Sequence, residues 1–247
     1  MSYELEQIYT WWFDSASLFL RYFLLAGAGY FVFYFWKKNR FSNIKIQKKN
    51  PSGSAIQKEI INSISTILIF CGTSWMVFQW QKSGITKIYL DIHQFGYAYF
   101  IFSIIIMVII HDAYFYWTHR FMHMPKIFTW VHRTHHLSDN PTPWTAFSFH
   151  PLEAIIAIGI IPIIVFILPC HPFAIFTFLT YMTLINVMGH LGYETFPYKF
   201  RQSKLGKWQN TSTNHDYHHQ HARYNFGLYF TFWDKFMNTY KSNDKRI

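Results

Sequence analysis

The sequence predicts an all-α, polytopic membrane protein with about four to five membrane-embedded helices and a cytoplasmic, histidine-rich helical cap that holds a dinuclear metal site. Three observations predict this class. The 247 residues are 51% hydrophobic and only 14% charged, which is too little charge to cover a soluble domain of this length. Apolar runs of about twenty residues recur, the length that a helix needs to cross hydrocarbon. Histidines gather in short clusters at helical spacing.

Three apolar runs are predicted to cross the membrane as single helices. They occupy residues 15–36, 60–80 and 97–117. A fourth apolar region, residues 152–188, is interrupted near its middle by two prolines and predicts a helical hairpin. Its first arm is short and contains Gly159, so we expect this arm either to kink or to enter the bilayer without crossing it.

Loop charge predicts the orientation. Short cytoplasmic loops carry an excess of lysine and arginine. The loop after the second run has two lysines and an aspartate, whereas the segment after the first run is strongly basic and contains Lys37, Lys38, Arg40, Lys45, Lys48, Lys49 and Lys58. If that segment is cytoplasmic, counting the crossings places every histidine cluster on the cytoplasmic side as well.

Composition also limits the partners and cofactors. The net charge of +10 is not accompanied by a nucleic-acid-binding motif, and the basic residues flank apolar runs. Anionic lipid headgroups are therefore the expected partners of this charge, and no nucleic acid is expected. The two cysteines, Cys71 and Cys170, lie within apolar stretches, so the sequence offers neither a disulfide framework nor the thiolates of an iron–sulfur cluster.

The histidine clusters predict a site for two metal ions. Residues three or four apart lie on one face of a helix, so the members of each cluster point the same way. The clusters are His119 and His123; His132, His135 and His136; and His215, His218 and His219. One zinc ion takes about four ligands, and eight imidazoles suit two ions. His190 ends the returning arm of the hairpin on the same side and is expected to be a ninth ligand.

Five other histidines have different expectations. His150 precedes a proline and is expected to line the site or to cap the next helix. His93 and His171 fall on the opposite side of the membrane and are expected to be structural. His111 lies two turns before the first cluster, where it faces either the site or a neighbouring helix, and His221 is left open.

Four segments around the histidines carry a family likeness. They are DAYFYWTHRFMH at 112–123, HRTHHLSDNPTPWTAFSFHP at 132–151, HLGYE at 190–194 and HDYHHQHARYNFGLYFTFWD at 215–234. Together they resemble the fatty acid hydroxylase and sterol desaturase superfamily of integral membrane di-iron oxygenases, and PTPW with the following FHP is most similar to the sterol C5-desaturase branch and its bacterial relatives. We expect membrane helices and a basic loop over residues 1–96, and the catalytic domain over 97–240.

The resemblance implies two iron ions as cofactors, with zinc able to replace them. The fatty acid 2-hydroxylase branch has a further histidine where this chain has Asn186, so an amide, a water molecule or one ligand fewer is expected there. Near its end the family usually has a glycine where this chain has Asn238, a mild change because asparagine tolerates a left-handed backbone.

Three acidic residues near the clusters are candidates for supporting the ligands. Asp112, Glu194 and Asp216 are predicted to orient the N–H groups of the histidines. A buried salt bridge with Arg120 or Arg133 is the alternative for Asp112.

The expected function is oxidation of a membrane lipid by dioxygen. Paired iron can reduce dioxygen and attack an unactivated C–H bond, whereas zinc has no redox chemistry. The sequence contains no flavin, haem or ferredoxin motif, so the reductant is expected to be a separate protein, a b-type cytochrome or a ferredoxin with its reductase. A zinc-dependent membrane hydrolase is one alternative, although the HExxH motif is missing. A metal-handling membrane protein without catalysis is the other.

Overall fold

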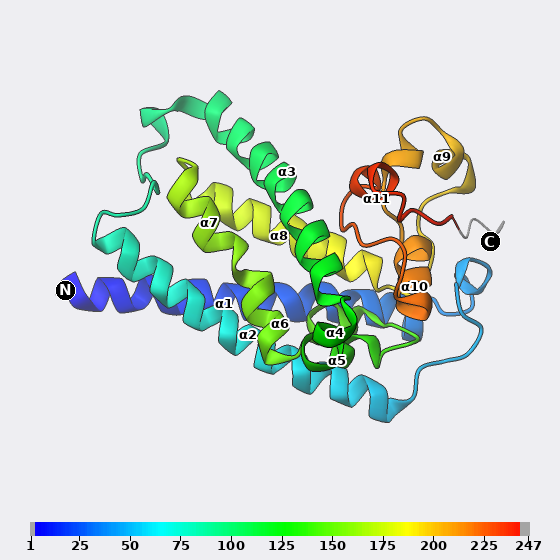
Figure 1. Ribbon diagram of the computed structural model, residues 1–247. Coiled ribbons are helices and arrows are strands. Elements are labelled where there is room, and N and C mark those ends of the chain that lie inside the picture. The colour runs from blue at the N-terminus through cyan, green and yellow to red at the C-terminus, as the bar shows by residue number, and fades with distance from the viewer. Residues whose placement is uncertain (1–2, 243–247) are drawn as a thin grey trace.

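The computed structural model describes residues 3–242. Every element of regular secondary structure named in this range is a helix (Figure 1). Four helical segments are long and apolar enough to cross a membrane. The first covers residues 13–36, where α1 (Tyr3–Tyr30) continues into the π-helical η1 (Phe31–Trp36). The others are α2 (Gly53–Lys82), α3 (Gly96–Met122) and α8 (Pro172–Gly189). These helices confirm the predicted class of an all-α, polytopic membrane protein.

The predicted spans are shorter than the helices that contain them. α2 begins at Gly53 rather than at residue 60, and the Ser52 hydroxyl caps it by accepting from the Ala55 N–H at 3.2 Å. α3 continues to Met122, past the predicted end at residue 117. Hydropathy identifies only the apolar part of a helix, which lies in lipid. The helix itself continues as long as its backbone N–H and C=O groups remain hydrogen-bonded within it. His119 therefore lies on the same rigid helix as the third span.

The first arm of the predicted hairpin is bent, as its glycine suggests. It consists of α6 (Pro151–Ile158) and α7 (Ile160–Ile167), which meet at Gly159. The Tyr114 hydroxyl, from α3, donates to the Ile156 carbonyl at 2.6 Å, directly beside the bend. A side chain that inserts into the backbone of a helix is an established cause of kinks.

We expect Gly159→Ala to destabilise the fold. A Cβ atom at this position would lie 2.7 Å from the Tyr114 hydroxyl oxygen, which is too close for either group to stay in place. The cost should be about 1–3 kcal/mol, typical of overpacking, and should appear as a lower midpoint of thermal unfolding in detergent. Adding Tyr114→Phe removes the clashing oxygen and should restore part of the loss. An undiminished loss in the double variant would show that the tyrosine hydroxyl is not the cause.

The apolar core lies where the long helices meet. Tyr22 of α1, Ile67 of α2 and Phe178 of α8 are fully buried there, together with Phe147 of the short helix η4 (Pro143–Phe147). The Tyr22 ring stacks on Phe147, and its hydroxyl donates to the Trp144 carbonyl at 2.8 Å. These contacts tie η4 to the membrane helices. The predicted division between residues 1–96 and 97–240 stays a prediction.

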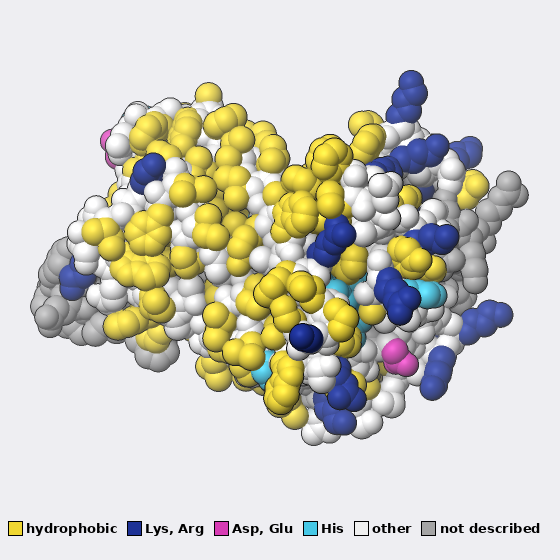
Figure 2. Space-filling view, viewed as in Figure 1, with side chains coloured by type: hydrophobic (Ala, Val, Ile, Leu, Met, Phe, Trp, Pro, Cys, Tyr) yellow, Lys and Arg dark blue, Asp and Glu magenta, His cyan; other side chains and the backbone are white. Residues whose placement is uncertain are grey.

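The remaining short helices form a cap at one end of the long helices (Figure 1). They are η2 (Ser42–Ile44), α4 (Pro125–Val131), α5 (Arg133–His136), α9 (Tyr198–Gln202), η5 (Gly206–Trp208), α10 (Ser212–His221) and α11 (Phe232–Phe236), while η3 (Ile92–Gln94) lies at the start of α3. Figure 2 shows the division on one face: apolar side chains dominate over the long helices, and most lysine and arginine side chains gather over the cap. This distribution suits a bundle in lipid with its cap in the polar layer.

Candidate metal centre

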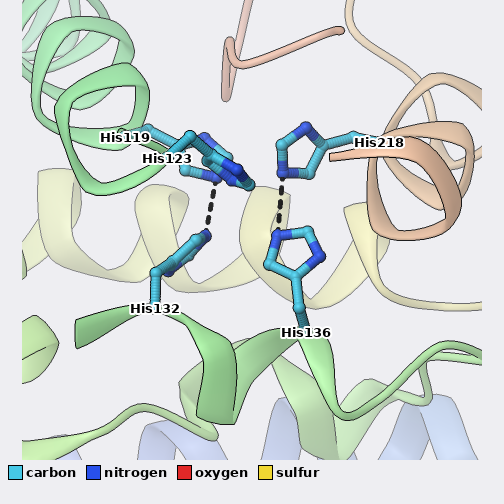
Figure 3. A group of neighbouring side chains, drawn as sticks. All are labelled: His119, His123, His132, His136 and His218. Carbon is cyan, nitrogen blue, oxygen red and sulfur yellow. Dashed lines mark hydrogen bonds between the residues drawn. The ribbon is translucent and has the colours of Figure 1, made fainter. Parts of the chain in front are cut away.

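Nine histidines meet in the cap in two groups. The first contains His119, His123, His132, His136 and His218, and the second contains His135, His190, His215 and His219. Within each group, one ring nitrogen from every member lies within 4.8 Å of the others. Figure 3 shows how the five rings of the first group converge from three directions. The structure thus brings together the three predicted clusters and His190.

The spacing of the histidines explains why there are two groups. On α5, His135 and His136 are neighbours in sequence, so their side chains point about 100° apart around the helix, one to each group. On α10, His218 and His219 divide in the same way, and His215 joins His219 because four residues bring it back to the same face. The repeated pattern of a histidine, two other residues and two histidines therefore lets one helix contribute histidines to both groups.

Caps and turns fix these helices in place. Pro125 at the first position of α4 turns the chain directly after α3 has delivered His123. α10 begins at a Thr211 cap, whose hydroxyl accepts from the Asn214 N–H at 3.3 Å. It ends at Ala222, which adopts a left-handed conformation with φ of 54°. The ligand-bearing helices are thus short and well terminated.

Backbone carbonyls orient most of the rings. In each of these contacts the Nδ1–H of a histidine donates to a carbonyl oxygen, which leaves the lone pair on Nε2. The pairs are His119 with Phe226 at 2.8 Å, His136 with His219 at 3.4 Å, His190 with Asn186 at 2.8 Å, His218 with Tyr224 at 2.7 Å and His219 with Ser138 at 3.0 Å. The tautomer that suits metal binding through Nε2 is therefore set by the fold.

The Nε2 atoms face one another at short range. The Nε2 atoms of His119 and His132 lie 3.0 Å apart, and those of His136 and His218 lie 3.1 Å apart (Figure 3). In the second group, His190 Nε2 lies 3.2 Å from that of His135 and 2.9 Å from that of His215. Two such nitrogens either share a proton in an N–H···N hydrogen bond or bind a common cation. This donor arrangement fits metal ions.

Two further nitrogens support this fit. The Nε2 atoms of His123 and His219 are buried, and neither has a hydrogen-bond partner within the described chain. A buried polar atom without a partner costs stability, so such atoms mark places where a further group binds. Each belongs to a different histidine group.

Burial keeps these imidazoles neutral. It lowers the pKa of His136 and of His190 to about 4. It lowers the pKa of His132 and His215 well below the usual range, with a further contribution from the neighbouring histidines. A protonated imidazole cannot bind a metal, so a low pKa preserves the ligands at neutral pH.

The three predicted supporting acids have other contacts. Asp112 accepts from the backbone N–H groups of Tyr229 and Phe230 at 3.3 and 3.2 Å. Over residues 3–242 it forms no ion pair with either of the two arginines considered from the sequence. Its contacts place it as an anchor for the loop that precedes α11, rather than beside a histidine.

Glu194 and Asp216 also bond away from the rings. Glu194 accepts from the Phe196 and Thr213 N–H groups, and Asp216 accepts from Gln47 at 2.7 Å. These contacts tie the start of α10 and the basic loop to the cap. The predicted direct contact of the three acids with histidine N–H groups is absent from the hydrogen bonds of the described residues.

Asn186 supports the site through its backbone. Its carbonyl accepts from His190 Nδ1, while its side-chain amide donates to the Ala146 carbonyl at 2.8 Å. The side chain also lines the cavity beside the histidines. Asn186 thus holds one ring directly and joins α8 to η4.

The carboxylate that does contact a histidine is one that the sequence-based analysis overlooked. Glu153 lies in the first turn of α6, and its Oε1 is 2.7 Å from His132 Nδ1, with both side chains buried. An acidic residue inside an apolar run at the membrane border is a signal of function, and this signal was available in the sequence. Glu153 is therefore the best candidate for orienting a ligand through a carboxylate.

The other histidines lie outside the two groups. His150 caps α6 by accepting from the Leu152 N–H, and His171 caps α8. His93 is in η3, at the far end of the molecule. His111 bonds the Tyr229 hydroxyl at 2.8 Å and packs against its neighbours, and His221 is exposed and stacks on Tyr217.

Comparison with known proteins agrees with these observations. The chain is 27% identical to the lathosterol oxidase of Rattus norvegicus over 188 residues, which are 75% of this chain and 61% of that protein. It is 26% identical to a Delta(7)-sterol 5(6)-desaturase of Gibberella zeae over 187 residues. These residues are 76% of this chain and 56% of that protein. The chain spans less than two thirds of the length of these relatives.

A family model gives the broader placement. No solved structure matches the chain significantly. The model described as fatty acid hydroxylase matches residues 104–239, a range that includes all nine histidines of the two groups and Glu153. The match extends over more than half of the chain. With four long apolar helices and a histidine-rich cap, this chain belongs to the fatty acid hydroxylase family.

Proposed function

We propose that the protein is a membrane-bound di-iron oxygenase that uses dioxygen and an external reductant to hydroxylate or desaturate a C–H position of a lipid. The observation that carries this proposal is the division of nine buried or half-buried histidines into two groups with facing Nε2 atoms. Membership of the fatty acid hydroxylase family and similarity to proteins named as an oxidase and desaturases of sterols support it.

The distances between ligand atoms fit nitrogens that bind a shared metal ion. Two nitrogens bound to one ion at about 2.1 Å are separated by about 3.0 Å at a right angle and by about 3.4 Å at the tetrahedral angle. The observed separations of 2.9–3.2 Å are compatible with nitrogens that share one ion. Iron is proposed because zinc has no redox chemistry and the chain is similar to proteins named as an oxidase and a desaturase. When bound, paired iron supplies the reduction of dioxygen and the oxidant that attacks a C–H bond.

The chain supplies a dry, partly apolar space beside the histidines. A small cavity is lined by His135, His190 and His215 on one side and by Phe115, Phe149 and Ala157 on the other. The apolar wall favours a hydrocarbon segment and excludes water, which protects a reactive oxidant from side reactions. The histidines hold the metals, and the phenylalanines hold the carbon to be oxidised near them.

We place the histidine cap on the cytoplasmic side. The basic segment between α1 and α2 lies at the same end as the cap, where the Ile46 N–H donates to the Gly192 carbonyl at 3.0 Å and the Gln47 amide donates to Asp216. Lysine and arginine are concentrated in cytoplasmic loops. Contact between this segment and the cap therefore supports a cytoplasmic active site.

The electron donor is proposed to dock beside His123. A groove of about 490 Å³ is lined by His123 together with Arg120, Arg223, Trp117 and Met124. It combines positive charge with apolar side chains and directly adjoins a member of the five-histidine group. An acidic partner, such as a b-type cytochrome or a ferredoxin, complements this surface.

Arg223→Glu should weaken docking without impairing the site. Reversing one charge at the edge of an interface mainly slows association, so the KM for the electron donor should rise by roughly 3–10-fold while kcat at saturating donor stays constant. The difference should shrink at high ionic strength. Lys204→Glu is the matched control, because Lys204 is equally exposed and does not line the groove. Equal KM values for the two variants would show that the groove is not the docking site of the electron donor.

Comparison of the host's lipids with and without the gene tests the proposed reaction. We expect one lipid class to gain one oxygen atom or to lose two hydrogen atoms when the gene is present. The His135→Ala variant should behave like the deletion. Two results would contradict the proposal: hydrolysis of a lipid in place of its oxidation, or the same lipid change in cells that carry the His135→Ala gene as in cells that carry the wild-type gene.

A further inference from the structure

A buried arginine, Arg21, lies inside the membrane part of the protein, far from the histidines. Arg21 lies on α1, eight residues into the span, or roughly 12 Å from its start. Its side chain is only 8% exposed, and its Nε atom has no hydrogen-bond partner within the described chain. A charged side chain at this depth is costly and is retained where it serves a function.

Arg21 lines a large cavity in the membrane part. This cavity, of about 610 Å³, lies between α1, α2, α7 and α8 at the end of the bundle opposite the cap. Its volume is typical of small-molecule sites. Asp14, Gln81 and Lys82 line its outer part, and Phe70 and Ile161 line its inner part.

The guanidinium packs against an aromatic ring. It lies 5.5 Å from the centroid of the Phe176 ring on α8. Among residues 3–242, no carboxylate lies within ion-pair distance of Arg21. Asp14 is seven residues away along α1, or roughly 10 Å, and is exposed. A planar guanidinium fork matches carboxylate and phosphate groups.

The cavity continues towards the histidines as a narrow apolar passage. Phe70, Ile158, Ile161 and Leu179 line both the large cavity and a second one of about 30 Å³. That second cavity shares His111, Phe115, Phe149, Ala157 and Asn186 with the cavity beside the metal ligands. A cavity of about 30 Å³ has room for only a few water molecules. A space this narrow suits a flexible hydrocarbon chain better than a rigid fused-ring body.

We propose that Arg21 is the anchor for the anionic head group of a single-chain amphiphile whose hydrocarbon tail runs through this passage to the histidine cap. The Phe176 ring that meets Arg21 and His190 are fourteen residues apart along α8, which is roughly 20 Å. The position that is oxidised then lies far from the head group. That last step rests on the proposed function, whereas the anion subsite itself does not.

Binding to the full chain in phosphatidylcholine nanodiscs tests the subsite without any reaction. The probes are tritiated palmitate and hexadecanol, which share a chain length and differ in charge. We expect palmitate to bind at least about tenfold more tightly, since a hydrogen bond to a charged group contributes that much or more. Arg21→Met should abolish the preference for palmitate by weakening palmitate binding and leaving hexadecanol binding unchanged. Arg21→Lys should keep part of the preference. Arg40→Met, at an exposed loop position, is the matched control.

Two further comparisons separate the parts of the proposal. Ile161 lines both cavities, so the larger side chain of Ile161→Trp should narrow the passage between them. This variant should bind palmitate more weakly and octanoate as tightly as the wild type, because the shorter tail ends before the passage. His218→Ala should bind palmitate like the wild type even though it is inactive, because His218 does not line the cavity that receives the tail; this keeps the subsite distinct from the reaction. Equal binding of palmitate by wild type and Arg21→Met, or binding of inorganic phosphate as tight as that of palmitate, would overturn the proposal.

Discussion

His135→Ala is expected to abolish lipid oxidation. His135 belongs to the four-histidine group, is buried, and has its Nε2 atom 3.2 Å from that of His190. Removal of a group that merely orients a ligand typically costs 10–100-fold in metal affinity or activity, and loss of a ligand should cost more than about a hundredfold. The measurement is turnover per chain together with metal content, which should fall by one ion.

Membrane insertion should be unchanged in this variant. The long helices bury their apolar surface in lipid and in the core around Tyr22 and Phe178, neither of which depends on the metal. His93→Ala is the matched control, because His93 lies in η3 at the opposite end of the molecule and should be nearly silent. An active His135→Ala protein would contradict the ligand assignment, and an inactive His93→Ala protein would contradict the topology.

Glu153→Gln should reduce activity by roughly 10–100-fold, the usual effect of removing a carboxylate that orients a metal-binding histidine. Glu153 Oε1 lies 2.7 Å from His132 Nδ1, and both side chains are buried. Glutamine preserves the shape and removes the carboxyl oxygen that contacts His132 Nδ1. Metal should be lost from the five-histidine group first, since His132 belongs to it.

Glu59→Gln provides a stringent comparison for this effect. Glu59 is as buried as Glu153, at 2% exposure each, but its Oε2 accepts from the Thr142 hydroxyl at 2.6 Å rather than from a histidine. Its substitution should change thermal stability and leave the metal-to-protein ratio intact. If both variants retain full metal, or both lose it equally, the contact between Glu153 and His132 does not tune the site.

The sequence predicted the membrane helices and the convergence of the histidines well, for a physical reason. Long apolar runs and repeated helical spacing are local patterns, and each is strong enough to be seen without the fold. His190 was predicted from its position at the end of an apolar arm, and the structure places its ring 5.0 Å from that of His135. What the pattern could not indicate is that adjacent histidines on α5 and α10 divide between two groups.

The supporting contacts were harder to predict because they depend on tertiary structure. Asp112, Glu194 and Asp216 are near the clusters in sequence, yet their carboxylates accept from backbone N–H groups and glutamine amides. Glu153 is seventeen residues from the nearest α5 histidine and reaches His132 only because α6 packs against α4. Backbone carbonyls, which orient most of the rings, leave no trace in a sequence at all.

The most direct measurement of the central claim is metal analysis combined with dioxygen uptake. The protein should be purified from iron-sufficient cells and supplied with a reductase system and with membrane lipid. The two histidine groups predict two iron ions per chain, and dioxygen uptake that requires both the reductant and the lipid. A chain that holds only zinc and consumes no dioxygen with any lipid or reductase would contradict the proposed oxygenase.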